Sequence, residues 1–306
     1  MPSIPTNVTP NPGVLHAILC QVATRSARTM EDVNYNTDLI LEWMDRAVSG
    51  YPGIDLVVFP ECCFQGGPTV ADWIDTALTL DSEPVRRVCE KCKELEIWGV
   101  FNPWIKPDNG RFIENTAILV NDKGEIVHTY VKMNPWIPYE PTAPGHHCGV
   151  VDGPKGTKIA LMICADSKYQ ERWREARLQG ANLVIHLSNW PAPYQHWHKL
   201  SNQAGALFNN LTVLAVNSVG KDDSYVFCGN SMIVDTAGKI VNEAPLGAEW
   251  LLEASVNPGA TAKGVAGKIT SNLIWEATHR GAACPDNNGI GLGLQDYEAY
   301  YEAMRF

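Results

Sequence analysis

In three segments of the chain, an apolar stretch typical of a strand ends in one reactive side chain. Val57-Val-Phe-Pro-Glu61 ends in a carboxylate, Thr129-Tyr-Val-Lys132 in an amine and Leu161-Met-Ile-Cys164 in a thiol. Together they form a chemical set for attack on an amide or nitrile carbon. The carboxylate can take the thiol proton and return it to the leaving amine, while the lysine ammonium and the backbone N–H after the cysteine can hold an oxyanion. The pattern predicts Glu61, Lys132 and Cys164 as catalytic residues.

Each residue alone has an ordinary structural explanation. A glutamate after a strand is often solvated, a lysine at a strand end often extends to solvent, and a cysteine is most often a buried packing residue. Cys164 ends a continuous apolar run from Ile159, and a helix over residues 171–179 follows, closed by Gly180. This places the thiol at the carboxyl edge of a sheet, where ligands bind, and near a helix N-terminus, which predicts a lowered pKa for Cys164.

The elements that would position these residues alternate along the chain, so we predict one α/β domain. Helices are expected over 31–48, 83–95, 171–179 and 196–209, and strands over 14–22, 56–59, 98–101, 115–120, 126–132, 159–164, 183–187, 212–217 and 250–256. The hairpin 231–241 is similar to 117–127, which would fit an internal pseudo-two-fold, although hairpins are common. We expect an extended arm over residues 1–13, a catalytic domain over 14–260 and a C-terminal extension over 261–306 with a short helix near 296–304.

Composition limits the classes of function. The 306 residues are 45% hydrophobic and 19% charged, which is typical of a globular enzyme and excludes general disorder. The net charge of −10 argues against nucleic-acid or anionic-membrane partners. Apolar runs fall short of the roughly 18 residues of a membrane span, and the first residues do not resemble a signal peptide. The nine cysteines are therefore expected to be reduced thiols in a cytoplasmic protein.

Two other groups of residues have types that can bind a metal, but a structural role explains each of them better. Cys89 and Cys92 have Cys-x-x-Cys spacing, but they fall on the apolar stripe of a predicted helix and have no second pair, so core packing is expected. His146-His-Cys148 could hold a metal, but adjacent histidines point to alternate sides, which favours an ordinary loop.

The three catalytic segments, in this order, resemble the nitrilase (carbon–nitrogen hydrolase) superfamily, with its Glu-Lys-Cys triad. The resemblance covers nearly the whole chain and rests on Phe59-Pro-Glu61, Tyr130-Val-Lys132 and Cys164-Ala-Asp-Ser-Lys-Tyr-Gln-Glu171. Pro135-Trp-Ile-Pro-Tyr-Glu-Pro141 and Thr278-His-Arg-Gly281 resemble motifs of its aliphatic amidase and formamidase branch. That branch implies a second catalytic carboxylate at Glu140.

One position departs from the branch. Ala165 follows the nucleophile where a larger side chain is common; its N–H can still hold the oxyanion, but the shape of that pocket wall is then open. Trp136, Tyr139 and Trp190 are equally compatible with packing and with the wall of a short acyl pocket. His279 and Arg280 would either contribute to the branch motif or only brace the C-terminal extension.

The resemblance implies a four-layer α-β-β-α sandwich of the nitrilase type, usually paired through its helical layer and often built into larger homo-oligomers. The C-terminal extension would then pack on the domain or on a partner subunit. The implied reaction is hydrolysis of a small aliphatic amide, such as formamide, to a carboxylic acid and ammonia, with no metal or organic cofactor. Two alternatives stay open: an N-carbamoyl compound hydrolase or nitrilase of the same superfamily, and a non-catalytic binding scaffold.

Overall fold

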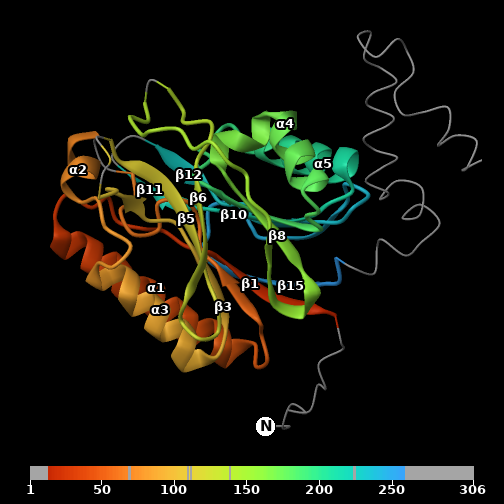
Figure 1. Ribbon diagram of the computed structural model, residues 1–306, viewed down its shortest axis with the longest axis horizontal. Helices are drawn as coiled ribbons and strands as arrows, with labels where there is room; N and C mark the ends of the chain where they lie inside the picture. Colours follow the sequence, from red (N-terminus) through yellow and green to blue (C-terminus); the bar gives the residue numbers. More distant parts are fainter. Residues whose placement is uncertain are drawn as a thin grey trace, which may run out of the picture. The chain divides into compact units, whose positions relative to one another are not determined.

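The computed structural model describes residues 13–258, except residues 68–69, 109, 111, 138 and 223–224. Its centre is a pair of β-sheets that face each other, and Figure 1 shows helices α1 and α3 outside one sheet and α4 and α5 outside the other. This confirms the expected α-β-β-α sandwich. The predicted N-terminal arm (but for Gly13), the C-terminal extension and its short helix lie outside the described residues.

The described elements divide into two runs that follow the chain. The first contains β1 (Leu15–Gln21), α1 (Met30–Gly50), β2 (Leu56–Val58), α2 (Val70–Asp75), α3 (Glu83–Leu95), β3 (Trp98–Phe101), β4 (Trp104–Ile105), β5 (Glu114–Val120) and β6 (Ile126–Val131). The second contains β7 (Val151–Asp152), η1 (Pro154–Gly156), β8 (Lys158–Ile163), η2 (Cys164–Lys168), α4 (Gln170–Leu178), β9 (Leu183–Ser188), α5 (Gln195–Asn209), β10 (Thr212–Asn217), β11 (Val219–Lys221), β12 (Val226–Cys228), β13 (Met232–Val234), β14 (Ile240–Glu243) and β15 (Trp250–Val256).

The two sheets repeat one connection pattern. Strands β1, β2 and β3 pair in parallel, and the antiparallel strands β5 and β6 follow. Strands β8, β9 and β10 also pair in parallel, and the antiparallel strands β13 and β14 follow. This arrangement agrees with the internal pseudo-two-fold that the two similar hairpins suggested. The last strand, β15, leaves the second sheet and pairs antiparallel with β1, with Val256 opposite Leu15.

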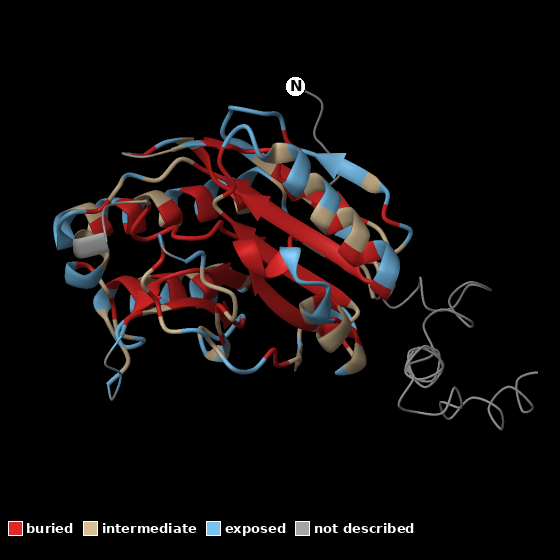
Figure 2. Ribbon diagram, turned by 90° about the horizontal axis from the view of Figure 1, so that it is seen from above, coloured by how far each residue is buried: buried red, intermediate tan, exposed pale blue. Residues whose placement is uncertain are grey.

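The central strands are apolar on both faces because each face is covered. Along β8, Ile159, Leu161 and Ile163 pack between the sheets, while Ala160 and Met162 pack against the α4–α5 layer. Figure 2 shows the central strands buried along most of their length. Since side chains alternate across a strand, two covered faces require a continuous apolar run. The described helices do not include one long and apolar enough to cross a membrane.

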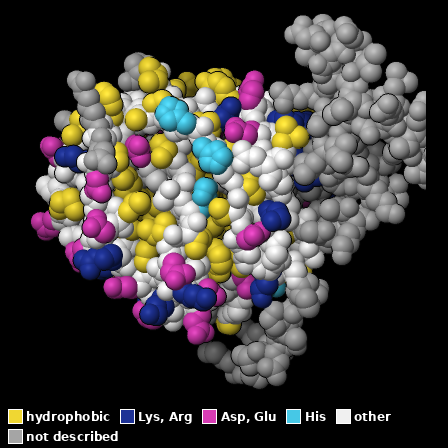
Figure 3. Space-filling model, in the orientation of Figure 1, with side chains coloured by type: hydrophobic (Ala, Val, Ile, Leu, Met, Phe, Trp, Pro, Cys, Tyr) yellow, Lys and Arg dark blue, Asp and Glu magenta, His cyan; other side chains and the backbone are white. Residues whose placement is uncertain are grey.

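The α1–α3 layer combines an apolar inner face with a charged outer face. Helix α1 begins at a capping box, in which Thr29 and Asp32 satisfy each other's backbone N–H groups. Cys89 and Cys92 of α3 pack into the core against the first sheet, which confirms their expected structural role. On the outside, Lys91 of α3 pairs with Asp45 of α1 at 2.7 Å. Figure 3 shows side chains of both charge signs over the part of the surface where these helices lie.

Candidate active site

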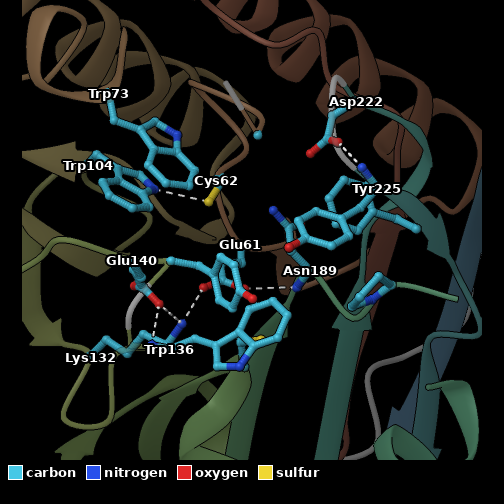
Figure 4. Close-up of a pocket in the computed structure, with 15 residues that line it drawn as sticks. Glu61, Cys62, Trp73, Trp104, Lys132, Trp136, Glu140, Asn189, Asp222 and Tyr225 are labelled. Carbon is cyan, nitrogen blue, oxygen red and sulfur yellow. Dashed lines mark hydrogen bonds and ion pairs between the residues drawn. The ribbon is translucent and has the colours of Figure 1, made fainter. Parts of the chain in front are cut away.

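The three predicted catalytic residues lie just beyond the ends of strands from both sheets and line one pocket of about 310 Å³. Glu61 follows β2 in a tight turn, Lys132 comes directly after β6, and Cys164 comes directly after β8. Glu140, from the loop after Lys132, lines the same pocket. Figure 4 shows the Lys132 side chain between the two carboxylates. The structure therefore brings together all four residues that the sequence singled out for catalysis.

Lys132 is a buried cation held by two buried carboxylates. Its Nζ lies 2.8 Å from Glu61 Oε1 and 2.6 Å from Glu140 Oε2. Burial by itself would lower the pKa of Lys132, but the charges of Glu140 and Glu61 outweigh it and raise the pKa well above its usual value. Burial would likewise raise the pKa of Glu140, but the Lys132 charge outweighs it and lowers the pKa. Lys132 is therefore a permanent cation, suited to hold negative charge.

Asn115 of β5 ties the two carboxylates together. Its side-chain amide donates to Glu61 Oε1 at 2.9 Å and to Glu140 Oε1 at 2.7 Å, while its carbonyl accepts from Asn102 at 2.9 Å. The backbone N–H of Asn189, just beyond β9, donates to Glu61 Oε2 at 2.9 Å. Each oxygen of Glu61 thus has a fixed partner, which fixes the direction of the carboxylate.

The nucleophile candidate sits in a strained turn. Cys164 has φ +46°, a left-handed conformation that costs a residue with a side chain about 1 kcal/mol or more. Its carbonyl oxygen accepts from Ser167 Oγ at 2.9 Å and lies 3.1 Å from His186 Nε2. Burial lowers the pKa of His186 to about 4, so this ring is neutral at pH 7. These contacts hold the turn that aims Cys164 at the pocket.

The expected lowering of the Cys164 pKa is wrong. Burial, followed by the nearby Glu61 carboxylate, raises the pKa of Cys164 well above its usual value, and Lys132 opposes this only in part. The short 3₁₀ turn η2 follows Cys164 directly, and α4 begins at Gln170, one residue before the start that was predicted for this helix, so the thiol does not lie at the helix N-terminus. At rest Cys164 is therefore a neutral thiol, and a base must take its proton when substrate binds.

Asp166 connects the lysine segment to the cysteine segment. Its carboxylate accepts from the Tyr130 hydroxyl at 2.7 Å, from the Asn134 N–H at 2.8 Å and from the Ile163 N–H at 3.0 Å. Burial raises the pKa of Asp166 to about 6. The tyrosine near the lysine and the aspartate near the cysteine are thus mutual partners, which ties the end of β6 to the end of β8 across the two sheets.

The predicted pocket aromatics divide into two groups. Trp136 and Tyr139 line the pocket, with ring centroids 5.2 Å apart, and the Trp136 N–H donates to Glu140 Oε2 at 2.9 Å. Trp190 instead packs in the core between the sheets, where Asn217 Oδ1 accepts a hydrogen bond from its backbone N–H at 2.7 Å. Ala165 is buried and is not among the residues that line the pocket. His279 and Arg280 lie outside the described residues.

Several pocket residues were missed by sequence reasoning. Cys62, directly after Glu61, receives a hydrogen bond from Trp104 Nε1 at 3.0 Å, and Trp104 stacks on Trp73 at 4.0 Å. These three residues form one wall, and Asp222, Tyr225 and Phe227 form another. Only Cys62 and Asn189 carried a signal, because each lies just beyond the end of a predicted strand, Cys62 after β2 and Asn189 after β9. Within the described chain, His146, His147 and Cys148 belong to no cluster of three possible metal ligands.

The arrangement is suited to acyl transfer. A thiol, a carboxylate and a fixed ammonium line one pocket whose remaining wall is largely aromatic. Such a site keeps charges close together and out of bulk water, which strengthens their effect on a polar transition state.

Comparison with known proteins gives one consistent result. Residues 19–263 match the model of the carbon-nitrogen hydrolase family. A formamidase of Pseudomonas syringae is 32% identical over 276 residues, covering 90% of this chain and 80% of that protein. A formamidase of Nitratidesulfovibrio vulgaris is 34% identical over 242 residues, covering 78% and 72%.

Solved structures agree on the fold. A mutant of the Nesterenkonia AN1 amidase from the nitrilase superfamily aligns with a TM-score of 0.74 at 23% identity, covering 83% of this chain and 95% of that chain. Saccharomyces cerevisiae Nit3, described as a member of branch 10 of the same superfamily, aligns with a TM-score of 0.73 at 24% identity, covering 81% and 92%.

Proposed function

The chain belongs to the carbon–nitrogen hydrolase family, and from this premise we propose that it hydrolyses small aliphatic amides to a carboxylic acid and ammonia through an acyl-enzyme on Cys164. The observation that carries the proposal is the buried Lys132 between Glu61 and Glu140, in the pocket that Cys164 also lines. The formamidase relatives support the amide as the bond that is cleaved.

In the first half of the reaction, Glu61 takes the Cys164 proton and the thiolate attacks the amide carbonyl carbon. Lys132 and the Ala165 N–H hold the oxyanion. The C–N bond then breaks as Glu61 returns the proton to nitrogen, and ammonia leaves. Glu140, fixed by Lys132, Asn115 and the Trp136 N–H, positions the amide nitrogen for this transfer.

In the second half, Glu61 takes a proton from water as the water oxygen attacks the acyl carbon. The C–S bond breaks, the carboxylic acid leaves and Cys164 regains its proton. One carboxylate therefore acts twice as base and twice as acid. Its fixed hydrogen bonds from Asn115 and Asn189 keep it in place for both halves.

A substrate panel tests the proposal. We expect kcat/KM for formamide, acetamide and propionamide to exceed that for matched nitriles and N-carbamoyl amino acids by about tenfold or more, because the hydrogen-bonding groups of the site match an amide. The measurement is the rate of ammonia release from each compound at equal enzyme concentration. A clear optimum at the nitriles or the carbamoyl compounds would contradict the amide assignment and leave the triad in place.

We further propose that the protein forms a homo-oligomer through α5. Trp197, Leu200, Leu207 and Phe208 are exposed on this helix, in contrast with the charged outer face of α1 and α3. A second copy of the same helix would cover this apolar stripe. Light scattering should give a dimer or larger species for the wild type, and Leu200→Glu should lower the mass. The control Leu246→Glu, at an exposed loop position, should leave the mass unchanged. A monomeric wild type would refute the proposed oligomer.

The cytoplasm is the proposed location. The eight described cysteines are free thiols, as expected of a reducing compartment. Cell fractionation that finds the protein outside the cytoplasmic fraction would contradict this.

A further inference from the structure

Two fully buried asparagines form a chain of hydrogen bonds that leads to the catalytic carboxylates. Asn102 comes directly after β3, and Asn115 lies in the neighbouring strand β5. Asn102 Oδ1 accepts from the Cys62 N–H at 2.7 Å, and Asn102 Nδ2 donates to Asn115 Oδ1 at 2.9 Å. Asn102 is not among the residues that line the pocket, and its side chain bonds neither carboxylate, so it acts on them through its neighbours.

The chemical groups at the two ends of this chain fix its direction. The Cys62 backbone N–H can only donate, so Asn102 must turn its oxygen toward Cys62 and its NH₂ group toward Asn115. Both N–H groups of the Asn115 amide are then left for Glu61 Oε1 and Glu140 Oε1. An ionised carboxylate can only accept, so both ends require the same direction. Reversal of either amide would place two donors or two acceptors against each other.

Asn102 also holds the turn that follows Glu61. Cys62, the next residue, has φ +56°, a left-handed conformation that is strained in a residue with a side chain. Asn102 contacts this turn twice, because its side chain accepts from the Cys62 N–H and its backbone N–H donates to Cys63 Sγ at 3.3 Å. Asn102 therefore restrains Glu61 at its main chain and, through Asn115, at its carboxylate oxygen.

The Asn115 amide is an important restraint on the second carboxylate as well. It donates to Glu140 Oε1 at 2.7 Å, whereas Thr142 Oγ1 lies 3.4 Å from the same oxygen. Without a correctly directed Asn115 amide, this oxygen would keep only the longer contact. A wrongly directed amide would present its own oxygen to both carboxylates and repel them.

We propose that Asn102 is a positioning residue for the proton transfers of the reaction: it fixes the direction of the Asn115 amide, which orients both carboxylates. The inference rests on the proposed amide hydrolysis, in which Glu61 moves the proton and Glu140 positions the amide nitrogen. It assigns a role in the reaction to a residue that lies outside the pocket lining. Small displacements of groups that transfer protons lower the rate strongly, so the loss of Asn102 should be visible in kcat.

Asn102→Ala tests this role with acetamide as the substrate. We expect kcat to fall about tenfold to a hundredfold, because a misplaced acid–base group loses much of its contribution to proton transfer. KM should stay near wild type, since Asn102 does not line the pocket. The matched control Asn209→Ala removes another buried amide, which donates to the Gly205 carbonyl within α5, and should leave kcat near wild type. A wild-type kcat in Asn102→Ala would overturn the inference.

A double-mutant cycle separates this role from a merely structural one. Because Asn102 acts through Asn115, Asn102→Ala should lower kcat much less in the Asn115→Ala background than in the wild type. Equal fold losses in the two backgrounds would overturn the inference and leave amide hydrolysis intact. Asn102→Asp is a second variant, in which the ionised side chain keeps an acceptor for the Cys62 N–H but has no donor for Asn115. It should lose kcat like Asn102→Ala, and full activity would show that filling the space and holding Cys62 are sufficient.

Neutron diffraction of the wild type tests the same inference without any variant, and it decides if the variants fail to fold. The deuterons of the Asn102 amide should lie toward Asn115, and those of the Asn115 amide should lie toward the two carboxylates. The opposite direction of either amide would overturn the inference. A wild type that cleaves no amide, formamide and acetamide included, would instead overturn the proposed function.

Discussion

Cys164→Ala should abolish amide hydrolysis, with kcat at least about ten-thousandfold below wild type, while the protein stays folded. The substitution removes the atom that would form the acyl-enzyme, and loss of a nucleophile typically costs this much or more. The main-chain turn should persist because Ser167 and His186 hold the Cys164 carbonyl, whatever its side chain. Ammonia release gives the rate, and circular dichroism with thermal melting gives the fold.

A matched cysteine separates chemistry from packing. Cys92→Ala also removes a buried thiol, but from the core between α3 and the first sheet. It should cost about 1 kcal/mol of unfolding free energy and leave kcat near wild type. Mass spectrometry of the wild type after mixing with an amide should detect the acyl group on Cys164. Turnover near wild type in Cys164→Ala would reject the acyl-enzyme, and a wild type inert toward all amides would favour a binding scaffold.

Lys132→Met should remove activity and also destabilise the protein. The variant leaves Glu61 and Glu140 buried without their shared cation, and breaking such a buried pair typically costs about 3–5 kcal/mol. The loss of an oxyanion partner should lower kcat by about a hundredfold to a thousandfold in the molecules that fold. Denaturant titration and ammonia release measure the two effects separately. The control Lys158→Met breaks an exposed pair with Asp152 and should cost no more than about 1 kcal/mol.

The pH dependence of this destabilisation has a definite sign. In the wild type, Lys132 lowers the pKa of Glu140 below its ordinary 4.5, so the ionised Glu140 stabilises the fold above that value, and this contribution is lost as the pH falls through the lowered pKa. Without Lys132, burial dominates and the pKa of Glu140 rises. The stability difference between wild type and variant should therefore be largest near pH 8 and shrink toward about pH 5. A difference that grows on acidification would contradict this account of the cluster.

Glu140→Gln tests the contribution of the second carboxylate separately from that of the lysine. The amide side chain keeps the size of glutamate but cannot exchange a proton, so activity should fall on the order of a hundredfold, in the range of a general acid–base contribution. The unfolding free energy should change less than in Lys132→Met, because Lys132 keeps its Glu61 partner. A rate of amide hydrolysis within a few-fold of wild type would show that Glu140 has only a structural role.

The residue pattern was sufficient for the buried strands and for the catalytic strand ends, whereas the four layers followed from the family resemblance. Apolar runs such as Ile159–Ile163 indicate strands covered on both faces, and reactive residues just after such strands are candidates for a site at the strand ends. The helix over 83–95 was predicted with the bounds that α3 has, because its apolar stripe and its ends are both marked by local sequence.

The partners of those residues could not be predicted in the same way. Asn115 is one polar residue within an ordinary strand, and only the pairing of β5 with its neighbours places it between Glu61 and Glu140. Trp190 follows a strand end like the other site residues, but it lies in the core, where the Asn217 side chain bonds both its backbone N–H and its carbonyl. Asp222 reaches the pocket only because Gly67, far away in sequence, leaves space for it.

The pairing of β15 with β1 has a consequence for how the chain folds during synthesis. On one side, strand β1 pairs with β15, a strand made more than two hundred residues later. Until then β1 presents a row of open backbone groups on an apolar strand, which invites association with other unfinished chains. Contacts so distant in sequence also slow folding. We therefore expect the first half of this chain to be prone to aggregation during translation until β15, which ends at Val256, has paired with β1.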